Sequence, residues 1–179
     1  MAKYTQDPTL PSHGKRAKAD NAGTIRVRIT RDAGLIITME PEAFDLYLNI
    51  NPTANIYNAT VEYEANFGEK KNVVPVVVPA DVIEDVIKLT GNKTFMSLKN
   101  IGIFPDMVML DGNDVKISVK SDAGNVTLDS NMLEDTLWNG KIAIKDNIIQ
   151  TPFDRLAAIA FNLLGIEPEP EIDEDEEEN

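Results

Sequence analysis

This sequence of 179 residues singles out no catalytic constellation: two of its 30 acidic residues could converge in space as a carboxylate pair, but nothing favours any particular pair. The chain contains no cysteine, so disulfides, thiolate metal sites and thiol nucleophiles are excluded. The single histidine, His13, lies among Pro, Ser, Gly and Lys residues with almost no apolar neighbours. A general base needs an orienting partner and a dry pocket, and nothing around His13 indicates either. We therefore predict that the protein is not an enzyme.

The segment closest to a metal-binding loop is Asp111-Gly112-Asn113-Asp114. In a calcium-binding EF-hand loop, an oxygen ligand would stand in place of Val115 and a glycine in place of Lys116. The segment is therefore interpreted as a hairpin turn. The lysines that follow Gly68 and Gly91 lack the spacing of a phosphate-binding P-loop. We predict no metal site and no cofactor.

A cluster of basic residues, Lys15, Arg16 and Lys18, lies near the start of the chain. It could contact three or four phosphates in a salt-dependent and nonspecific way, dock on an acidic protein surface, or only solubilise the chain. These three interpretations stay open. Residues 1–23 are rich in Pro and Gly and show no hydrophobic periodicity, so we expect an extended basic arm that does not fold alone.

An acidic tail, residues 167–179, contains nine acids and no base, while the whole chain has a net charge of −13. Pro168 and Pro170 prevent a helix here, and the like charges repel one another and stay solvated. A functional tail would occupy a basic groove or compete with phosphate. Its densest run is Asp173, Glu174, Asp175, Glu176, Glu177 and Glu178.

Between the two ends, residues 24–166 are expected to form one β-rich domain. Ile25, Val27 and Ile29 alternate with polar residues, as in a strand with one buried face. Pro75 interrupts a further apolar run and indicates a sheet edge. We predict an α+β fold with an antiparallel sheet, or a small sandwich or barrel of hairpins, and two or three helices. The expected strands cover residues 24–31, 35–37, 44–50, 57–63, 73–78, 107–110, 115–119, 126–128 and 142–144.

Three turns are expected to join strands into hairpins. Asp32-Ala33-Gly34 would join 24–31 to 35–37, residues 111–114 would join 107–110 to 115–119, and Asp122-Ala123-Gly124 would lead into 126–128. The first and third turns have the same sequence and each is followed later by a helix that ends at a glycine. A divergent internal duplication is one hypothesis for this similarity, and two unrelated hairpins are the other.

Helices are expected between Pro79 and Gly91 and over residues 132–138 and 152–164. Gly91 stands where a left-handed C-cap would close the first helix, and Gly165 would end the last. Thr151 is the expected N-cap of the last helix. That helix is apolar on nearly every side, so it is either buried in its own domain or docks one face on a neighbouring subunit. The candidate docking residues are Phe153, Leu156, Phe161 and Leu164.

The acidic tail resembles the tails of phage and bacterial single-strand-binding proteins, and the resemblance is limited to this tail. It would imply an OB barrel with basic grooves, stacking aromatic residues and a tail that ends in a hydrophobic residue. Here the tail ends in Glu-Glu-Glu-Asn instead. A stacking face beside Lys70 and Lys71 could be formed by Tyr47, Tyr57, Tyr63 and Phe67, although Tyr57 and Tyr63 share their strand face with Val61 and fit a core equally well.

The favoured hypothesis is a non-catalytic structural or assembly component of a larger complex, such as a capsid, connector or tail-associated protein of a bacteriophage virion. Its partners would be other protein subunits, with nucleic acid as a further partner of the N-terminal arm. The alternative is a single-stranded nucleic-acid-binding protein that its acidic tail regulates. No apolar run approaches the roughly 20 residues of a membrane span, and no leader is recognised, so we expect a protein of the cytoplasm or the virion.

Overall fold

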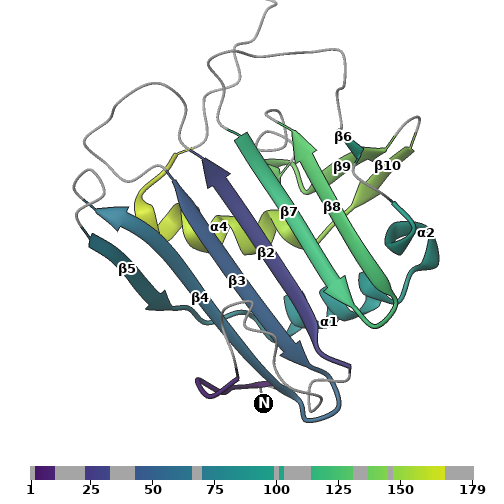
Figure 1. The fold of residues 1–179 in the computed structure, drawn as a ribbon, viewed down its shortest axis with the longest axis horizontal. Coiled ribbons are helices and arrows are strands. Elements are labelled where there is room, and N and C mark those ends of the chain that lie inside the picture. Colours follow the sequence, from purple (N-terminus) through teal and green to yellow (C-terminus); the bar gives the residue numbers. More distant parts are fainter. Residues whose placement is uncertain are drawn as a thin grey trace, which may run out of the picture.

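The computed structural model describes residues 3–10, 23–32, 43–65, 70–98, 101–102, 114–130, 137–144 and 147–167. These residues form the α+β, β-rich fold that the sequence predicts (Figure 1). A large, mostly antiparallel sheet is accompanied by a second sheet of two strands and by three helices, which lie behind one face of the large sheet. Within the described ranges, no helix has both the length and the apolar character needed to cross a membrane.

Alternation of apolar and polar residues produces the strands, because successive side chains point to opposite faces of a sheet. The large sheet contains β1 (Thr5–Gln6), β2 (Ile25–Asp32), β3 (Phe44–Asn51), β4 (Ile56–Ala65), β5 (Lys70–Pro75), β6 (Ile101–Gly102), β7 (Asp114–Ser121) and β8 (Gly124–Ser130). The small sheet consists of β9 (Lys141–Ile144) and β10 (Asn147–Gln150), of which the sequence predicted only the first.

The strands of the large sheet follow the order β1-β4-β3-β2-β7-β8-β6, and β5 also pairs with β4. β5 and β1 share the outer edge of β4, because β5 pairs with residues 60–65 and β1 with residues 56–57. The β1–β4 and β6–β8 pairs are parallel, and the others are antiparallel. Pro75 lies in β5, outside β4, as expected for a residue that cannot donate to a central ladder.

Two of the three predicted hairpins are wrong. β2 pairs with β3 on one side and β7 on the other, so neither edge is free for residues 35–37. β7 lies between β2 and β8, which leaves no edge for residues 107–110. Residues 35–37 and 107–110 themselves lie outside the described ranges. The third hairpin is confirmed, because β7 and β8 are antiparallel and meet at the Asp122-Ala123-Gly124 turn.

The order of elements is similar in the two halves of the chain. Among the described residues, the strands β2 to β5 precede α1 (Ala80–Thr90), and the strands β7 to β10, with helical residues 137–138 between β8 and β9, precede α4 (Phe153–Leu164). The two segments that resemble each other in sequence lie side by side, since β2 and β7 are neighbours. In the second half, however, β9 and β10 form a sheet of their own. The duplication stays a prediction.

The core lies between the apolar face of the large sheet and the helices α1, α2 (Lys93–Met96) and α4. Phe161 of α4 meets the ring of Phe44 edge to face at 5.4 Å between centroids, and Trp138 stacks on Phe161 at 4.5 Å. Trp138 is in the described end of the segment predicted as a helix over 132–138. Because aromatic side chains bury large apolar areas, these contacts fix α4 on the sheet.

The helix ends differ in part from the sequence predictions. Gly91 has a φ of −77°, so the predicted left-handed C-cap of α1 is wrong; the chain instead begins α2 almost at once, with Asn92 as its N-cap. Gly165 has a φ of +70° and ends α4 as predicted. Thr151 is not the N-cap of α4. That position is held by Pro152, and no side chain caps the helix there.

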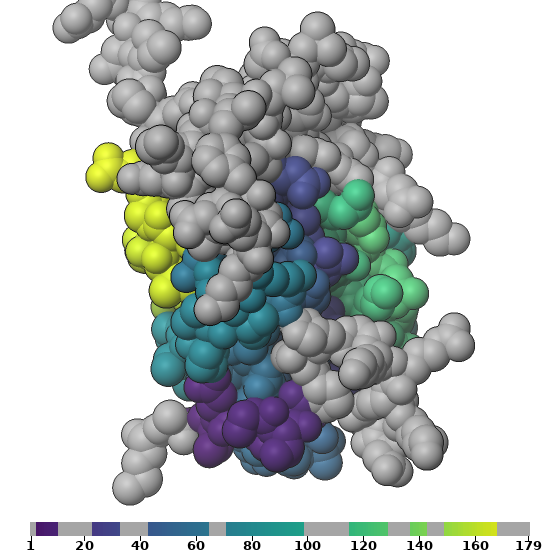
Figure 2. Space-filling view, turned by 60° about the vertical axis from the view of Figure 1, so that its left-hand side comes forward, coloured from purple at the N-terminus to yellow at the C-terminus, as the bar shows by residue number. Residues whose placement is uncertain are grey.

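Residues 3–10, which the sequence assigned to the basic arm, pack against the domain. The Thr5 N–H donates to the carbonyl of Asn55, just before β4, at 3.0 Å, and the Asp7 N–H donates to the Tyr57 carbonyl of β4 at 2.7 Å. Tyr4 and Leu10 are buried. Figure 2 shows this segment in purple at one end of the molecule, beside β4. The first part of the arm therefore belongs to the folded domain.

Candidate functional site

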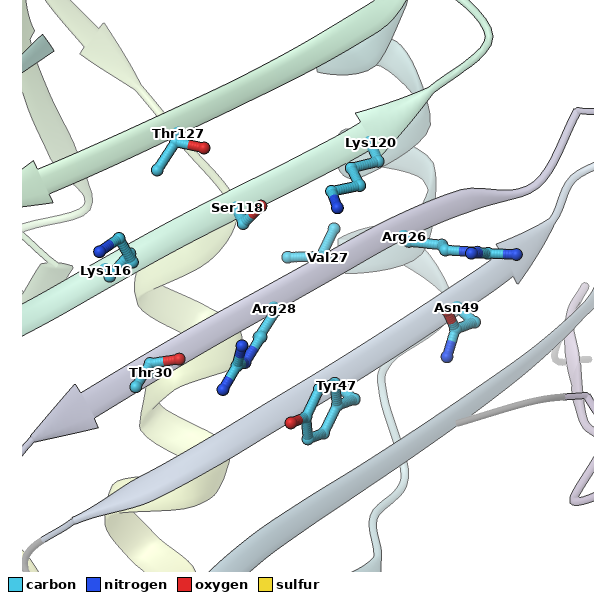
Figure 3. A pocket seen from close by; sticks show the side chains of 10 residues that line it. All are labelled: Arg26, Val27, Arg28, Thr30, Tyr47, Asn49, Lys116, Ser118, Lys120 and Thr127. Atoms are coloured by element: carbon cyan, nitrogen blue, oxygen red, sulfur yellow. The ribbon is translucent and has the colours of Figure 1, made fainter. Parts of the chain in front are cut away.

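The strands that supply the core also present a polar face on the opposite side of the sheet. In β2, Ile25, Val27 and Ile29 are buried in the core, while Arg26, Arg28 and Thr30 alternate with them. A groove of about 490 Å³ lies on this face, lined by side chains of β2, β3, β7 and β8 (Figure 3). Four of its lining residues are cations, namely Arg26, Arg28, Lys116 and Lys120.

The register of β2 and β7 brings two of these cations face to face. Arg26 is directly opposite Lys120, and the side chains of such a pair lie about 5 Å apart at their Cβ atoms. Among the described residues, no carboxylate forms an ion pair with either side chain. Like charges directly opposite each other destabilise a sheet. The repulsion between Arg26 and Lys120 therefore destabilises the sheet locally, and a bound anion would reduce this repulsion.

Arg28, the next residue of β2 on this face, is held in one orientation by Asp45 of β3. Its Nε and one terminal nitrogen donate to the two carboxylate oxygens at 3.0 and 3.1 Å. The Thr30 hydroxyl donates to the same carboxylate at 2.6 Å. Bidentate contacts of this kind fix the plane of a guanidinium group. Arg28 is thus a rigid, partly neutralised cation, unlike Arg26.

The fixed guanidinium of Arg28 lies 5.4 Å from the ring centroid of Tyr47, within the range of a cation–π contact. Tyr47 is half-buried, and burial, followed by the charge of Asp45, raises the pKa of its hydroxyl. The phenol therefore stays neutral at physiological pH and keeps its donor proton. Figure 3 shows Arg28 and Tyr47 projecting from neighbouring strands toward each other.

Beyond the groove, toward the edge of the sheet formed by β5, a cation is paired with a carboxylate. Lys71 of β5 forms an ion pair with Glu62 of β4 at 2.6 Å, and only 4% of the Glu62 side chain is exposed. This pairing raises the pKa of Lys71. Among the described groove cations, Arg26 of β2 and Lys120 of β7 are the two that stand directly opposite each other without an ion pair to a described carboxylate.

The candidate residues from the sequence lie elsewhere. Lys15, Arg16, Lys18 and the acidic residues 173–178 fall outside the described residues. Phe153, Leu156 and Phe161 are at most 1% exposed and belong to the core of their own domain, and Leu164 packs against that core. Burial in the chain's own core is one of the two alternatives that the sequence left open for this helix, and it leaves little of α4 available for docking.

The four aromatic residues considered as a stacking face do not act together. Tyr57 is buried in the core, where its hydroxyl accepts a hydrogen bond from the Val78 N–H at 3.3 Å. Tyr63 packs against the same core. Phe67 lies outside the described residues. Tyr47 alone lines the groove.

The groove cations are visible in the sequence as the polar positions of two strands. The sequence gives no sign that β2 pairs with β7, because about ninety residues separate Arg26 from Lys116. Each strand alone is typical of an ordinary solvent-facing surface. Only their pairing concentrates the charge. Within the described ranges, no group of three or more His, Asp or Glu side chains is placed to hold a metal ion.

Comparison of the sequence with models of known protein families gave no match. A comparison with curated proteins gave none either.

Proposed function

We propose that this protein binds single-stranded nucleic acid along the groove on the polar face of its large sheet. The cross-strand pair of Arg26 and Lys120, for which no described carboxylate forms an ion pair, carries the proposal. Phosphate groups would offset the repulsion between these two cations. Because the whole chain has a net charge of −13, a local excess of positive charge is not a by-product of its composition.

The acidic tail has a role in the same proposal. Residues 167–179 carry nine negative charges, and these charges compete with phosphate for the groove. Protein that ends before Glu167 is therefore expected to bind an oligonucleotide more tightly than the full chain.

Fluorescence anisotropy with a labelled oligothymidine at low salt tests the proposal. Replacing both groove cations, Arg26→Gln with Lys120→Gln, is expected to weaken binding about tenfold or more, since two charge-assisted contacts are lost. The matched control removes two charges from elsewhere, Lys88→Gln on α1 with Lys141→Gln on β9, and should bind nearly as the wild type does.

The salt dependence of the same titration gives a second measure. Two phosphate contacts, at Arg26 and Lys120, predict a slope of about −1.4 for log K against log salt concentration, and the double groove variant should remove most of this salt dependence. Absence of binding by both the full chain and the chain that ends before Glu167 would refute the proposal.

An assembly role is the second function that we propose, and one observation favours it. β5 lies at the edge of the sheet, and the valines Val73 and Val77 in and just after it are 50% and 74% exposed. Exposed apolar residues beside an edge strand are typical of surfaces that pair with another chain. The phage virion remains a proposal that rests on the sequence alone.

A further inference from the structure

We propose that the groove consists of two unlike subsites, one that takes the face of a nucleobase at Arg28 and Tyr47 and one that takes phosphate at Arg26 and Lys120. The inference rests on the proposed function, since it names the part of the nucleic acid that each subsite recognises. It identifies the partner as unpaired nucleotides, whose bases are accessible.

The hydrogen bonds of Arg28 argue against a role in phosphate binding. Two of its nitrogens already donate to the Asp45 carboxylate, which is only 19% exposed and also accepts from Thr30. To bind these nitrogens, a phosphate would have to displace the Asp45 carboxylate from its two charge-assisted hydrogen bonds. The same bonds hold the guanidinium plane in place, so no conformational freedom is lost when a flat group stacks on it.

The surroundings of Arg28 suit a base. Its side chain is 50% exposed, and its guanidinium lies 5.4 Å from the Tyr47 ring centroid. Unpaired bases stack on aromatic rings and on the planes of arginine side chains. In a duplex the base faces are covered by neighbouring base pairs, so a stacking subsite selects single strands.

The neighbouring pair has the opposite character. Arg26 and Lys120 repel each other, and among the described residues neither forms an ion pair with a carboxylate. Arg26 and Arg28 are alternate residues of β2, so their Cα atoms lie about 7 Å apart along the strand. A base and its own phosphate, which a single sugar joins, can reach both subsites. Figure 3 shows all four side chains along the same groove.

The test compares two labelled oligonucleotides of equal length in fluorescence anisotropy with the full chain, one of oligothymidine and one in which every base is replaced by an abasic sugar. Both carry the same phosphates. We expect the abasic strand to bind about tenfold or more weakly, as the loss of a stacked base predicts. A duplex of the same length should also bind more weakly than the single strand.

Two arginine-to-lysine variants assign the subsites. Arg28→Lys keeps the positive charge but loses the planar guanidinium group and its two hydrogen bonds to Asp45. The affinity of this variant for oligothymidine should therefore fall to the affinity for the abasic strand, and its affinity for the abasic strand should equal that of the wild type. Arg26→Lys, the same substitution two residues away, should keep the preference for bases. Tyr47→Leu is a second variant of the base subsite and should also remove the preference for oligothymidine over the abasic strand. Tyr47→Phe, which keeps the aromatic ring, should retain that preference.

The outcomes separate the two proposals. Equal binding of the oligothymidine and abasic strands by the wild type overturns the base subsite and leaves phosphate binding intact. A preference that survives in both Arg28→Lys and Tyr47→Leu places the stacking elsewhere and also overturns it. No binding of either strand, with or without the tail, refutes nucleic-acid binding itself.

Discussion

Asp154 carries a partly buried carboxyl group near the N-terminus of a helix. It lies in the first turn of α4, and its Oδ1 is buried without a described hydrogen-bond partner. The other oxygen, Oδ2, is close to Gly140, where an added Cβ would come within 2.8 Å of it. Burial raises the pKa of Asp154, and the N–H groups of Arg155 and Asp154 lower it by less.

Replacing Asp154 with asparagine should therefore change how stability depends on pH. As pH rises above about 4, the unfolded chain loses the Asp154 proton before the folded protein does, so this group reduces the free energy of unfolding as pH increases toward its raised pKa. In Asp154→Asn this loss is absent. Urea unfolding at about pH 3 and pH 7 should show that the variant gains stability relative to wild type as pH rises.

Asp81→Asn is a control of opposite sign. A hydrogen bond from Arg155 lowers the pKa of Asp81, so its contribution is present at neutral pH and lost as pH falls through that lowered value. This variant should be less stable than wild type at pH 7 and equal to it at the lowest pH. Identical pH profiles for Asp154→Asn and wild type would contradict the assignment to Asp154.

At the scale of elements, β1 shows how a short segment can be fixed on a sheet edge by a few contacts. It pairs with β4 over only two residues. The Gln6 side chain donates to the carbonyl of Val76 at 3.2 Å. Val76, the residue after β5, itself donates its N–H to Ala59 of β4, so Gln6 links β1 to the segment that follows β5. Tyr4, which is 7% exposed, adds apolar contact with the core.

We expect Tyr4→Ala to lower the free energy of unfolding by about 2–3 kcal/mol, because truncating a buried aromatic side chain removes its burial and leaves a cavity. Lys3→Ala is the matched control. Lys3 pairs with Glu84 of α1 at 3.2 Å and its ammonium lies 5.6 Å from the Tyr4 ring centroid, but the Lys3 and Glu84 side chains are largely exposed, so its loss should cost much less than the loss of the buried Tyr4 ring. Chemical denaturation measures both. A Tyr4→Ala effect no larger than that of Lys3→Ala would show that the segment contributes little to stability.

For the whole molecule, the distribution of charge and of exposed apolar surface separates two candidate interfaces. The cations gather on the polar sheet face over β2 and β7, whereas Val73 and Val77 lie at the β5 edge. A nucleic acid and a protein partner would therefore use different parts of the same domain.

The assembly proposal predicts self-association or association with a partner chain through the β5 edge. Light scattering should give a mass above the 19.8 kDa of one chain, and Val77→Asp should return it toward that value, because a charge beside an edge strand opposes pairing. Leu163→Asp, at the 41% exposed position of α4, is the control and should have no effect. A monomeric wild type at all concentrations would count against self-association, as would a mass that responds only to Leu163→Asp.

The sequence by itself determined the secondary-structure class and much of the core. Alternation in β2, β3, β4 and β7 has a period of two, so it reports which residues share a face without reference to any partner. The stripe of α1 and the glycine after α4 are local signals of the same kind. Gly91 misled because its residue type permits a left-handed conformation without requiring one, and the immediate start of α2 decided otherwise.

Strand pairing was decided only by the tertiary structure. Nearby turn signals favoured local hairpins, whereas β2 pairs with β7 across an intervening stretch of more than eighty residues, because that arrangement joins their apolar faces over one core. The candidate site depends on this pairing. Arg26 and Lys120 are ordinary polar positions in their own strands, and they become a candidate site for an anion only because the register places them opposite each other.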